Sequence, residues 1–521
     1  MRRRRAAAGL VATVLVLAAC TGSPDPEPTP TDTSATAPSV VPRPANLDLE
    51  AGDPFALGTG VTVAADPAMV APARALADLV EDDTGIAVQA AATDGDISVV
   101  KDPDVTGIDG YRLEVGHDGI TIAAAGPSGA FAAVQTLRQL VPLGEPGQTR
   151  QVPPVRVVDA ARFAYRGAML DVARHFFDVE DVERYVDDIS ALKVNHLHLH
   201  LSDDQGWRIA VTSWPKLTEV GAANAVDGDP GGFYTQDDYR AIVAYAASRG
   251  VTVVPEIDLP GHTNAALTSY AELNPGGKAV PAYSGIDVGF STLDPSSETT
   301  YRFVKDVLDE VAAMTPGPYL HMGGDESRAT SDEDYAKFVK RAAGIAADTG
   351  KTVIGWHEIT DAGELPPGTV AQYWNYVRPE TTSLASRMRA YVEGGGQLLM
   401  SPADVAYLDM KYDESSPHGL LWARGYTDLT EAYGWDPAAI IDGVGDDGIL
   451  GVEAPIWTET LRTIEDVESM AFPRLAAIAE IAWTAQADRQ YDDFVTRLPA
   501  LGDRWAAAGV AYTPVSGVPW E

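Results

Sequence analysis

The clearest chemical signal in the sequence is a run of six residues from His321 to Glu326 (HMGGDE). Its two glycines permit an unusual backbone just before two adjacent carboxylates, Asp325 and Glu326. An enzyme that attacks with its own carboxylate usually takes it from a different strand than its acid, about 5 to 5.5 Å away. The motif therefore predicts that Asp325 and Glu326 have different duties on one side of a bond that breaks. An acidic loop end without chemistry would carry the same residues.

Acidic and aromatic residues also close other short apolar runs of the chain. These residues are Asp171 and Arg174, Asp203 and Asp204, Glu256 and Asp258, Trp356 and Glu358, Trp374, and Trp457 with Glu459. Carboxylates bond hydroxyl groups and supply or accept protons, while indole rings stack on the apolar faces of pyranose rings. Together they predict a sugar-binding site, provided that the fold gathers them at one place.

The elements that would position these residues can be counted after Asp159. Eight apolar runs of strand length cover 165–172, 196–203, 251–258, 319–326, 353–358, 369–375, 397–402 and 449–457. Helical patterns lie between several of them, at 179–192, 235–249, 297–314, 332–349 and 380–393. This order predicts an α/β fold with a (β/α)8 TIM barrel over residues 159–521, whose active site lies at the carboxyl ends of the strands. A doubly wound sheet is the alternative, but the first run is followed by DVARH rather than a glycine-rich turn.

The preceding region, residues 46–158, predicts a small α+β domain. Short strands are expected at 61–64, 97–100, 111–115 and 120–124, and helices at 68–84 and 128–141. Gly116 to Gly119 (GHDG) between two alternating runs is a hairpin signal. Titratable residues do not gather here, so we expect this domain to buttress the barrel.

The first 45 residues indicate export. Four arginines from Arg2 to Arg5 precede an apolar run up to Ala19, which predicts a signal peptide over residues 1–19. The sequence LAAC ending at Cys20 resembles a lipoprotein cleavage box, and Cys20 is the only cysteine of the chain. We therefore expect lipidation at Cys20, anchorage at a bacterial cell surface, and a Pro/Thr/Ser-rich tether over residues 20–45. An ordinary secreted protein is the alternative, and a twin-arginine route stays open.

The composition and charge of the chain argue against some classes of protein. The 521 residues are 45% hydrophobic and 22% charged, as expected for a globular chain. The formal net charge of −37 argues against nucleic acid as a partner, because phosphate backbones are held by clustered cations.

Seven blocks of residues carry a family resemblance. They are FAYRGAMLDVARHFF (163–177), HLHLHLSDDQGW (196–207), VPEIDLPGH (254–262), HMGGDE (321–326), IGWHE (354–358), YLDMKY (407–412) and GVEAPIWTE (451–459). In this order they resemble glycoside hydrolase family 20, the β-N-acetylhexosaminidases. The small domain is similar to that family's N-terminal domain.

The resemblance implies a retaining, substrate-assisted hydrolysis in which the substrate's own acetamido oxygen attacks the anomeric carbon. It implies that Glu326 is the general acid and that Asp325 orients the acetamido group as it becomes an oxazolinium cation. Tyr407 would bond the acetamido oxygen, and His262 with Asp203 would relay protons toward the acid. Because Glu326 must be protonated to act, burial and the nearby Asp325 are expected to raise its pKa.

The resemblance also implies a closed, exo-acting sugar pocket without metal or organic cofactor. Trp356, Trp374 and Trp457 would wall it, while Arg166, Asp409 and Glu459 would bond the outer hydroxyls of a terminal N-acetylglucosamine or N-acetylgalactosamine. The residues themselves leave alternatives open: the tryptophans could be core packing, Tyr407 a buried core tyrosine, His262 a structural histidine, and Arg166 part of a structural ion pair.

Two rival functions remain. His196, His198 and His200 alternate, so a strand would place them on one face, as in metal-dependent barrel hydrolases. That mechanism needs further ligands from later strands, where tryptophan and glutamate predominate. A glycan-binding lipoprotein without turnover is the other rival, but it would need neither Asp325 nor Glu326.

Overall fold

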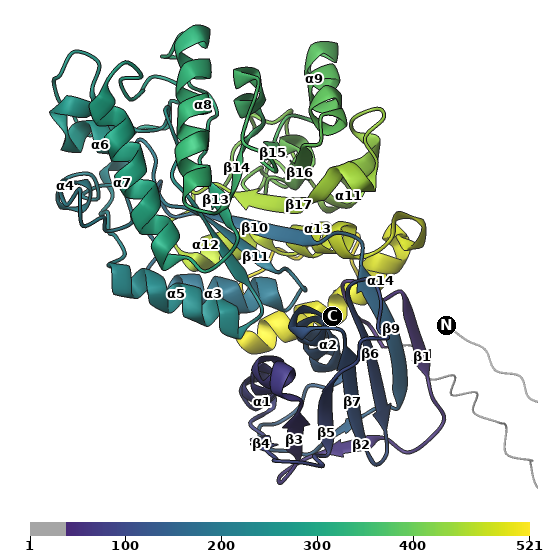
Figure 1. The fold of residues 1–521 in the computed structure, drawn as a ribbon. Helices are drawn as coiled ribbons and strands as arrows, with labels where there is room; N and C mark the ends of the chain where they lie inside the picture. The colour runs from purple at the N-terminus through teal and green to yellow at the C-terminus, as the bar shows by residue number, and fades with distance from the viewer. Residues whose placement is uncertain (1–37, 521) are drawn as a thin grey trace, which may run out of the picture. The chain divides into compact units, whose positions relative to one another are not determined.

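The structure is a computed structural model that describes residues 38–520. The predicted signal peptide, Cys20 and most of the predicted tether lie outside the described residues. Figure 1 shows a barrel with its surrounding helices, and a smaller domain built on a sheet of its own. Among the helices of the described region, none is long and apolar enough to cross a membrane.

Eight parallel strands close into a barrel, which confirms the predicted (β/α)8 architecture. The strands are β10 (Tyr165–Asp171), β11 (His196–His200), β12 (Thr252–Glu256), β13 (Tyr319–His321), β14 (Thr352–Trp356), β15 (Val370–Tyr373), β16 (Gln397–Met400) and β17 (Ile449–Ile456). The first strand pairs with the last, with Gly167 opposite Glu453, and this pairing closes the ring. Seven of the eight predicted apolar runs contain one of these strands in full, and the run 353–358 overlaps β14, which begins one residue earlier.

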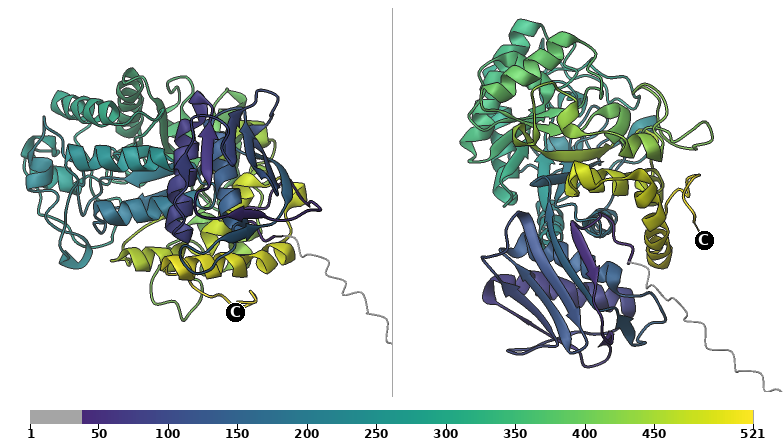
Figure 2. Two further views of the ribbon diagram at one scale, coloured as in Figure 1. Left: turned by 90° about the horizontal axis from the view of Figure 1, so that it is seen from below. Right: turned by 90° about the vertical axis from the view of Figure 1, so that its right-hand side faces the viewer.

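Helices surround the barrel, as Figure 2 shows from two further sides. They include α3 (Val179–Ser190), α5 (Gln236–Ser248), α7 (Glu298–Met314), α8 (Asp332–Asp348) and α9 (Thr382–Glu393), at the predicted places. After β17 come α12 (Ile464–Ala471), α13 (Arg474–Trp483) and α14 (Tyr491–Ala508), while β14 is followed only by the short 3-10 helix η4 (His357–Ala362). Side-chain capping sets the residue at which α5 begins, because the Thr235 side chain and Asp238 form a capping box there.

The small domain is a seven-stranded sheet with the order β1-β9-β6-β7-β5-β3-β4. Its strands are β1 (Asn46–Leu49), β3 (Thr62–Ala65), β4 (Gln89–Ala90), β5 (Ile97–Lys101), β6 (Ile108–Gly116), β7 (Gly119–Ala124) and β9 (Val155–Ala161). Helices α1 (Val70–Thr84) and α2 (Pro127–Leu140) pack on it around a separate apolar core, and β2 (Phe55–Leu57) pairs with β8 (Arg150–Val152). The predicted GHDG hairpin joins β6 to β7. Strand β9 runs past the predicted boundary at residue 158.

Residues 38–45 are packed, contrary to the prediction that the tether extends to residue 45. Val40 is buried in the core of the small domain and Val41 in the core of the barrel. The backbone N–H of Val41 donates to Gln139 Oε1 (2.8 Å), and that of Arg43 donates to Glu480 Oε2 (2.9 Å). Two adjacent valines thus pack into two different cores, and a pattern of two residues is too short to detect in the sequence.

A buried charged cluster joins the two domains. Lys193, in the loop before β11, places its ammonium 3.0 Å from Asp159 of β9 and 4.3 Å from the ring centre of Trp483 in α13. Asp159 also accepts from Trp483 Nε1 (3.0 Å) and Tyr111 OH (2.8 Å). The donors around the carboxylate are hydrogen-bonded, which allows the charges to be buried. Because the members of the cluster come from both domains, it holds the small domain against the amino-terminal end of the barrel.

Candidate active site

A cavity of about 450 Å³ lies at the carboxyl ends of the barrel strands. Six predicted site residues, together with Arg174, supply its polar and aromatic walls. The six are His262, Asp325, Glu326, Trp374, Tyr407 and Trp457. Glu459 closes one part of the wall, and the apolar rim consists of Ile286, Val288, Leu420, Leu421 and Trp422. The arrangement fits a small amphipathic ligand with hydroxyl groups on its edge and apolar faces.

The HMGGDE segment turns sharply after the short strand β13. Gly323 and Gly324 adopt φ of +66° and +109°, and Glu326 adopts +43°. A side chain on Gly323 would place its Cβ 1.8 Å from Asp258 Oδ1, and the same oxygen accepts from the Gly324 N–H (2.9 Å). The two glycines therefore allow the segment to lie directly on Asp258. Left-handed backbone at Glu326 costs about 1–3 kcal/mol and is typical of functional sites.

His262 lies between the predicted relay partner and the two acidic residues of the motif. Its Nδ1 is 3.1 Å from Asp203 Oδ1, and its Nε2 is 3.6 Å from both Asp325 Oδ2 and Glu326 Oε2. Burial would lower the pKa of His262, but the carboxylates of Asp203 and Asp325 outweigh burial and raise it well above 6.5. The imidazole is therefore cationic and bridges three acids.

The pKa of Glu326 departs from the sequence-based prediction. Burial raises it, as expected, but the nearby imidazolium of His262, with the charges of Arg328 and Arg174, lowers it by more, and the net pKa lies below 4.5. The Arg328 guanidinium is 2.6 Å from Glu326 Oε1. The prediction of a raised pKa was wrong because it counted Asp325 and omitted three cations that only the fold brings near.

Asp325 and the deeper Asp258 form a pair of buried carboxyls. Burial and the charge of Glu326 raise the pKa of Asp325, although His262 opposes them, and burial together with Asp325 raises that of Asp258 well above 3.8. Of the two carboxyls, Asp258 has the more strongly raised pKa and is therefore the one that more readily holds a proton. Within the described chain, Asp325 Oδ1 is buried without a hydrogen-bond partner. Such an oxygen suits a positively charged or N–H-bearing ligand atom.

Aromatic side chains form the opposite wall. Tyr407 packs between Trp457 and Trp422, with ring centres 6.3 and 5.6 Å away. Trp374 donates its Nε1–H to both oxygens of Glu358 (3.0 and 2.9 Å), which fixes the indole plane. Burial and the charge of Asp325 raise the pKa of Glu358 to about 8.

Three predicted site residues lie behind the cavity surface rather than on it. Trp356 donates to Glu256 Oε1 (2.9 Å) and backs Trp457 at 5.9 Å between ring centres. Asp203 is buried behind His262. Asp409 is buried beside Glu459, and burial with that neighbouring charge raises its pKa well above 3.8. Both oxygens of Asp409 and Oε2 of Glu459 have no hydrogen-bond partner among residues 38–520.

Arg166 lies away from the site, which contradicts its predicted role. It is the second residue of β10, at the amino-terminal end of the barrel, where Nη2 donates to Asp109 Oδ2 (2.8 Å) and Nε to Lys193 O (2.9 Å). The structural ion pair considered as its alternative is what the structure contains. Arg174, just past the end of β10, reaches the cavity instead, with Nη2 2.9 Å from Asp203 Oδ2 and the guanidinium over Trp457.

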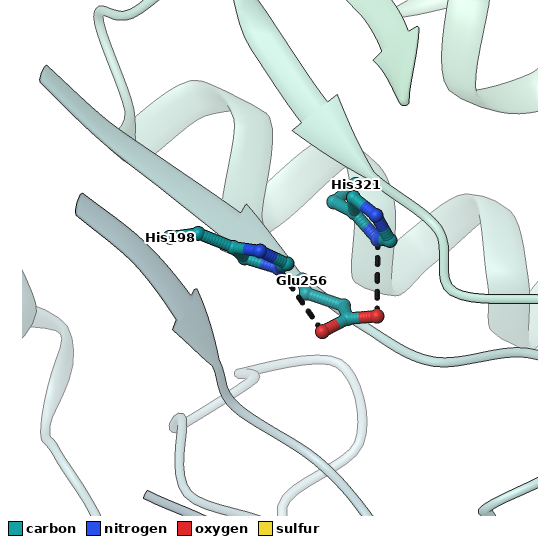
Figure 3. Close-up of side chains that lie close together, drawn as sticks. All are labelled: His198, Glu256 and His321. Atoms are coloured by element: carbon teal, nitrogen blue, oxygen red, sulfur yellow. Dashed lines mark hydrogen bonds and ion pairs between the residues drawn. The ribbon is translucent and has the colours of Figure 1, made fainter. Parts of the chain in front are cut away.

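The histidines of β11 do not converge on one ligand position. His196 stacks on Tyr165 at 3.9 Å between ring centres, whereas His198 and His200 each lie between two carboxylates. Figure 3 shows His198 and His321 on either side of Glu256. These three residues have ligand atoms close enough to hold a metal ion, but both Glu256 oxygens already accept hydrogen bonds. Their geometry favours an internal hydrogen-bond network.

Two residues of the site were missed by the sequence analysis. Trp422 lies between β16 and β17 in a long loop without regular spacing, so no signal distinguished it. Arg328 follows the acidic motif by two residues, and only the left-handed turn at Glu326 brings the two side chains together.

Family models match nearly all of the described chain. The model "Glycosyl hydrolase family 20, catalytic domain" matches residues 163–486, and "Glycosyl hydrolase family 20, domain 2" matches residues 37–160. The chain belongs to glycosyl hydrolase family 20. It is therefore a glycoside hydrolase, as the acidic and aromatic cavity also indicates.

Three relatives of this family 20 member align over almost their full length. A β-N-acetylhexosaminidase of Cellulomonas fimi is 43% identical over 490 residues, covering 92% of this chain and 97% of the relative. The family 20 β-N-acetylhexosaminidase of Streptomyces coelicolor A3(2) superposes with a TM-score of 0.87 at 44% identity, over 93% of this chain and 99% of that one. A mutant Streptomyces plicatus β-hexosaminidase in complex with its product GlcNAc gives 0.88 at 45% identity, over 93% and 98%.

Proposed function

We propose that this family 20 member is an exo-acting β-N-acetylhexosaminidase that releases terminal N-acetylglucosamine or N-acetylgalactosamine from the non-reducing end of a glycan. The supporting observation is the cavity itself: Asp325 and Glu326 share one wall, and Tyr407 with Trp457 forms the facing one. The relatives named above carry the same activity in their names. Glu459, whose Oε2 has no hydrogen-bond partner among residues 38–520, would bond an outer hydroxyl of the terminal sugar, with the buried Asp409 behind it.

The first chemical step breaks the glycosidic bond without an enzyme nucleophile. The acetamido oxygen of the substrate attacks the anomeric carbon, while Glu326 gives its proton to the departing oxygen. The C–O bond to the leaving group breaks, and an oxazolinium cation forms. The Asp325 carboxylate stabilises the acetamido N–H as positive charge develops, and Tyr407 bonds the acetamido oxygen.

The second step restores the enzyme. The Glu326 carboxylate takes a proton from water, and the water oxygen attacks the anomeric carbon from the side that the leaving group left. The bond to the acetamido oxygen breaks, which gives the free sugar with retained configuration. His262, bridging Asp203 and Glu326, stabilises the anionic form of Glu326 between the two steps.

A chromogenic screen tests this function. Nitrophenyl N-acetylglucosaminide and N-acetylgalactosaminide are expected to be hydrolysed, whereas the plain glucoside, which lacks the acetamido group, should not be. Activity unchanged by a chelator would count against the metal-dependent rival, and no turnover of either acetamido substrate would support a glycan-binding protein.

Asp325→Asn tests the mechanism. The variant should lose about 10²-fold or more in kcat on acetamido substrates, since the developing cation loses its anionic partner. Equal rates on sugars with and without the 2-acetamido group would indicate an enzyme nucleophile and overturn the substrate-assisted step.

We also propose export and anchorage through a lipid on Cys20. The support is the sequence LAAC after an arginine-flanked apolar run. The full-length protein expressed in a bacterium should partition into detergent, and Cys20→Ala should shift it to the aqueous phase. Equal partitioning of both proteins would contradict the anchor.

A further inference from the structure

A row of alternating carboxylates and imidazoles leads from the middle of the barrel to His262. Glu453, His198, Glu256 and His200, here called the inner row, come from β17, β11, β12 and β11 in that order. All four side chains are fully buried, and none lines the cavity of about 450 Å³. Asp203 links the last of them to His262.

Each member of the row hydrogen-bonds the next. The distances are 2.8 Å from His198 Nδ1 to Glu453 Oε1, 3.0 Å from His198 Nε2 to Glu256 Oε2, 2.8 Å from His200 Nε2 to Asp203 Oδ2, and 3.1 Å from His262 Nδ1 to Asp203 Oδ1. His200 Nδ1 also bonds Glu256 Oε2. Figure 3 shows one link of this row, between His198 and Glu256. Inward-facing alternation on β11 places both histidines inside the barrel.

Because carboxylates and imidazoles alternate along the row, the positions of their protons depend on one another. An ionised carboxylate only accepts hydrogen bonds, so an imidazole between two of them must carry hydrogen on both nitrogens. The pKa values agree: burial opposes the charge, but Glu453 and Glu256 raise the pKa of His198 to about 9, and Glu256 and Asp203 raise that of His200 well above 6.5. A change of charge at one member therefore alters the preferred proton position at the next.

The remaining contacts hold the row in place without breaking the alternation. Glu256 Oε1 accepts from Trp356 and lies 3.0 Å from His321 Nδ1, while Glu453 accepts from Tyr165 and Gln372. The charged groups facing His262 and its partners from the neighbouring elements are Asp203, Asp204, Asp258, Asp325, Glu326, Arg174 and Arg328.

We infer that the inner row positions His262 and adjusts its proton as Glu326 alternates between acid and base. The inference rests on the proposed function, in which Glu326 is neutral before the first step and anionic after it. His262 contacts Glu326 on one side and, through Asp203, the row on the other. A shift of each hydrogen across one hydrogen bond of the row can therefore compensate for each change in the charge of Glu326. The four members are positioning residues, because they act through His262.

Glu453→Gln is the sharpest test, since it removes one charge and keeps the shape. The amide oxygen can still accept from His198 and Gln372, and the Tyr165 hydroxyl can turn to accept from the new NH₂ group. The measurement is kcat/KM for acetamido substrates with a good leaving group (dinitrophenyl) and a poor one (methyl or a second sugar). Only the poor leaving group needs full protonation by Glu326.

We expect kcat/KM on the poor leaving group to fall about tenfold, with KM unchanged, and the value on the dinitrophenyl substrate to stay within about twofold. With one anionic partner gone, His198 should lose its proton at lower pH, so activity on the poor substrate should decline at lower pH than in the native enzyme. Equal losses on both substrates, or an unchanged pH profile with no loss, would overturn the inference.

A double variant and a matched control complete the design. In a Glu326→Gln background, Glu453→Gln should have no further effect on the poor substrate if it acts through Glu326, whereas additive losses would contradict this. Glu480→Gln removes another fully buried carboxylate, paired with Arg497 at 2.8 Å, and should reduce stability without separating the two substrates.

Two further measurements keep the result interpretable. If Glu453→Gln does not fold, Tyr165→Phe, which removes one hydrogen bond to Glu453 (2.6 Å), should produce the same separation with a smaller amplitude, and no separation would count against the row. Native enzyme without activity on any acetamido glycoside would refute the proposed function itself, whereas an active native enzyme with an insensitive Glu453→Gln variant refutes only the inner row.

Discussion

Glu326 has an acidic pKa for a group that must deliver a proton. Burial favours its neutral form, but His262 and Arg328 favour the anion, and Arg328 contacts it at 2.6 Å from an exposed position. A substrate that displaces Arg328 and excludes water would remove part of this bias and raise the pKa when the proton is needed. The free enzyme therefore keeps its acid in the form that the second step uses.

Arg328→Gln tests this view. Removing the guanidinium should raise the pKa of Glu326, so the limb of kcat/KM that falls with rising pH should move to higher pH. The shift should be small because the Arg328 side chain is 66% exposed and solvent screens its charge. A pH–rate profile of the native enzyme and the variant provides the measurement, and a limb that moves to lower pH would contradict the assignment.

Glu326→Gln should remove general acid catalysis while leaving sugar binding intact. We expect kcat on a substrate with a poor leaving group to fall by about 10² to 10⁴, with a much smaller loss on the dinitrophenyl substrate. Inhibition by the sugar product, measured in parallel, should be little changed. Unchanged turnover on the poor substrate would reject Glu326 as the acid.

At the scale of elements, the carboxyl ends of the predicted strands located most of the site residues. Eight apolar runs with polar ends predicted the barrel and placed Asp325, Glu326, Trp374 and Trp457 on one cavity, whereas Tyr407 was predicted only from the family resemblance. The same rule would have excluded Arg166, which stands near the start of β10, in favour of Arg174, just past its end.

Other features depend on long-range packing that one sequence does not encode locally. The pKa of Glu326 depends on His262, which follows β12, and on Arg174, which follows β10. Trp422 enters the wall through a loop without periodicity, and the packed segment 38–45 is composed like a tether.

Gly323→Ala tests the turn after β13. The added methyl group would overlap Asp258 and require a left-handed backbone for alanine, so the segment that carries Asp325 and Glu326 must shift. A misplacement of about 1 Å can reduce catalysis about 10²-fold. We expect kcat to fall by that order and stability to decrease. Gly344→Ala, inside α8 where a Cβ meets open space, is the matched control and should leave kcat unchanged and slightly raise stability.

At the scale of the whole molecule, Asp159 holds the two domains together through Lys193, Trp483 and Tyr111. The cluster lies at the opposite end of the barrel from the cavity, so stability and catalysis can be separated here. The buttressing role of the small domain stays a prediction.

Asp159→Asn should leave the Lys193 ammonium buried without an anionic partner. We expect the free energy of unfolding to fall by about 3 kcal/mol, measured by denaturant titration, with kcat and KM at 25 °C unchanged. Glu333→Gln, which breaks the exposed pair with Lys337, is the control and should not alter stability. A large change in KM for Asp159→Asn would show that the junction and the cavity are coupled.

Val40 and Val41 give the chain a defined point up to which it can be shortened. The two neighbouring residues insert into different cores, so both domains depend on the same short stretch. Enzyme shed from a cell by cleavage ahead of Pro38 would keep these insertions and hydrolyse dissolved and surface-bound glycans alike. Cleavage after Val41 would remove one buried side chain from the core of each domain and so destabilise both. The position of the cut would therefore determine whether the released enzyme stays folded.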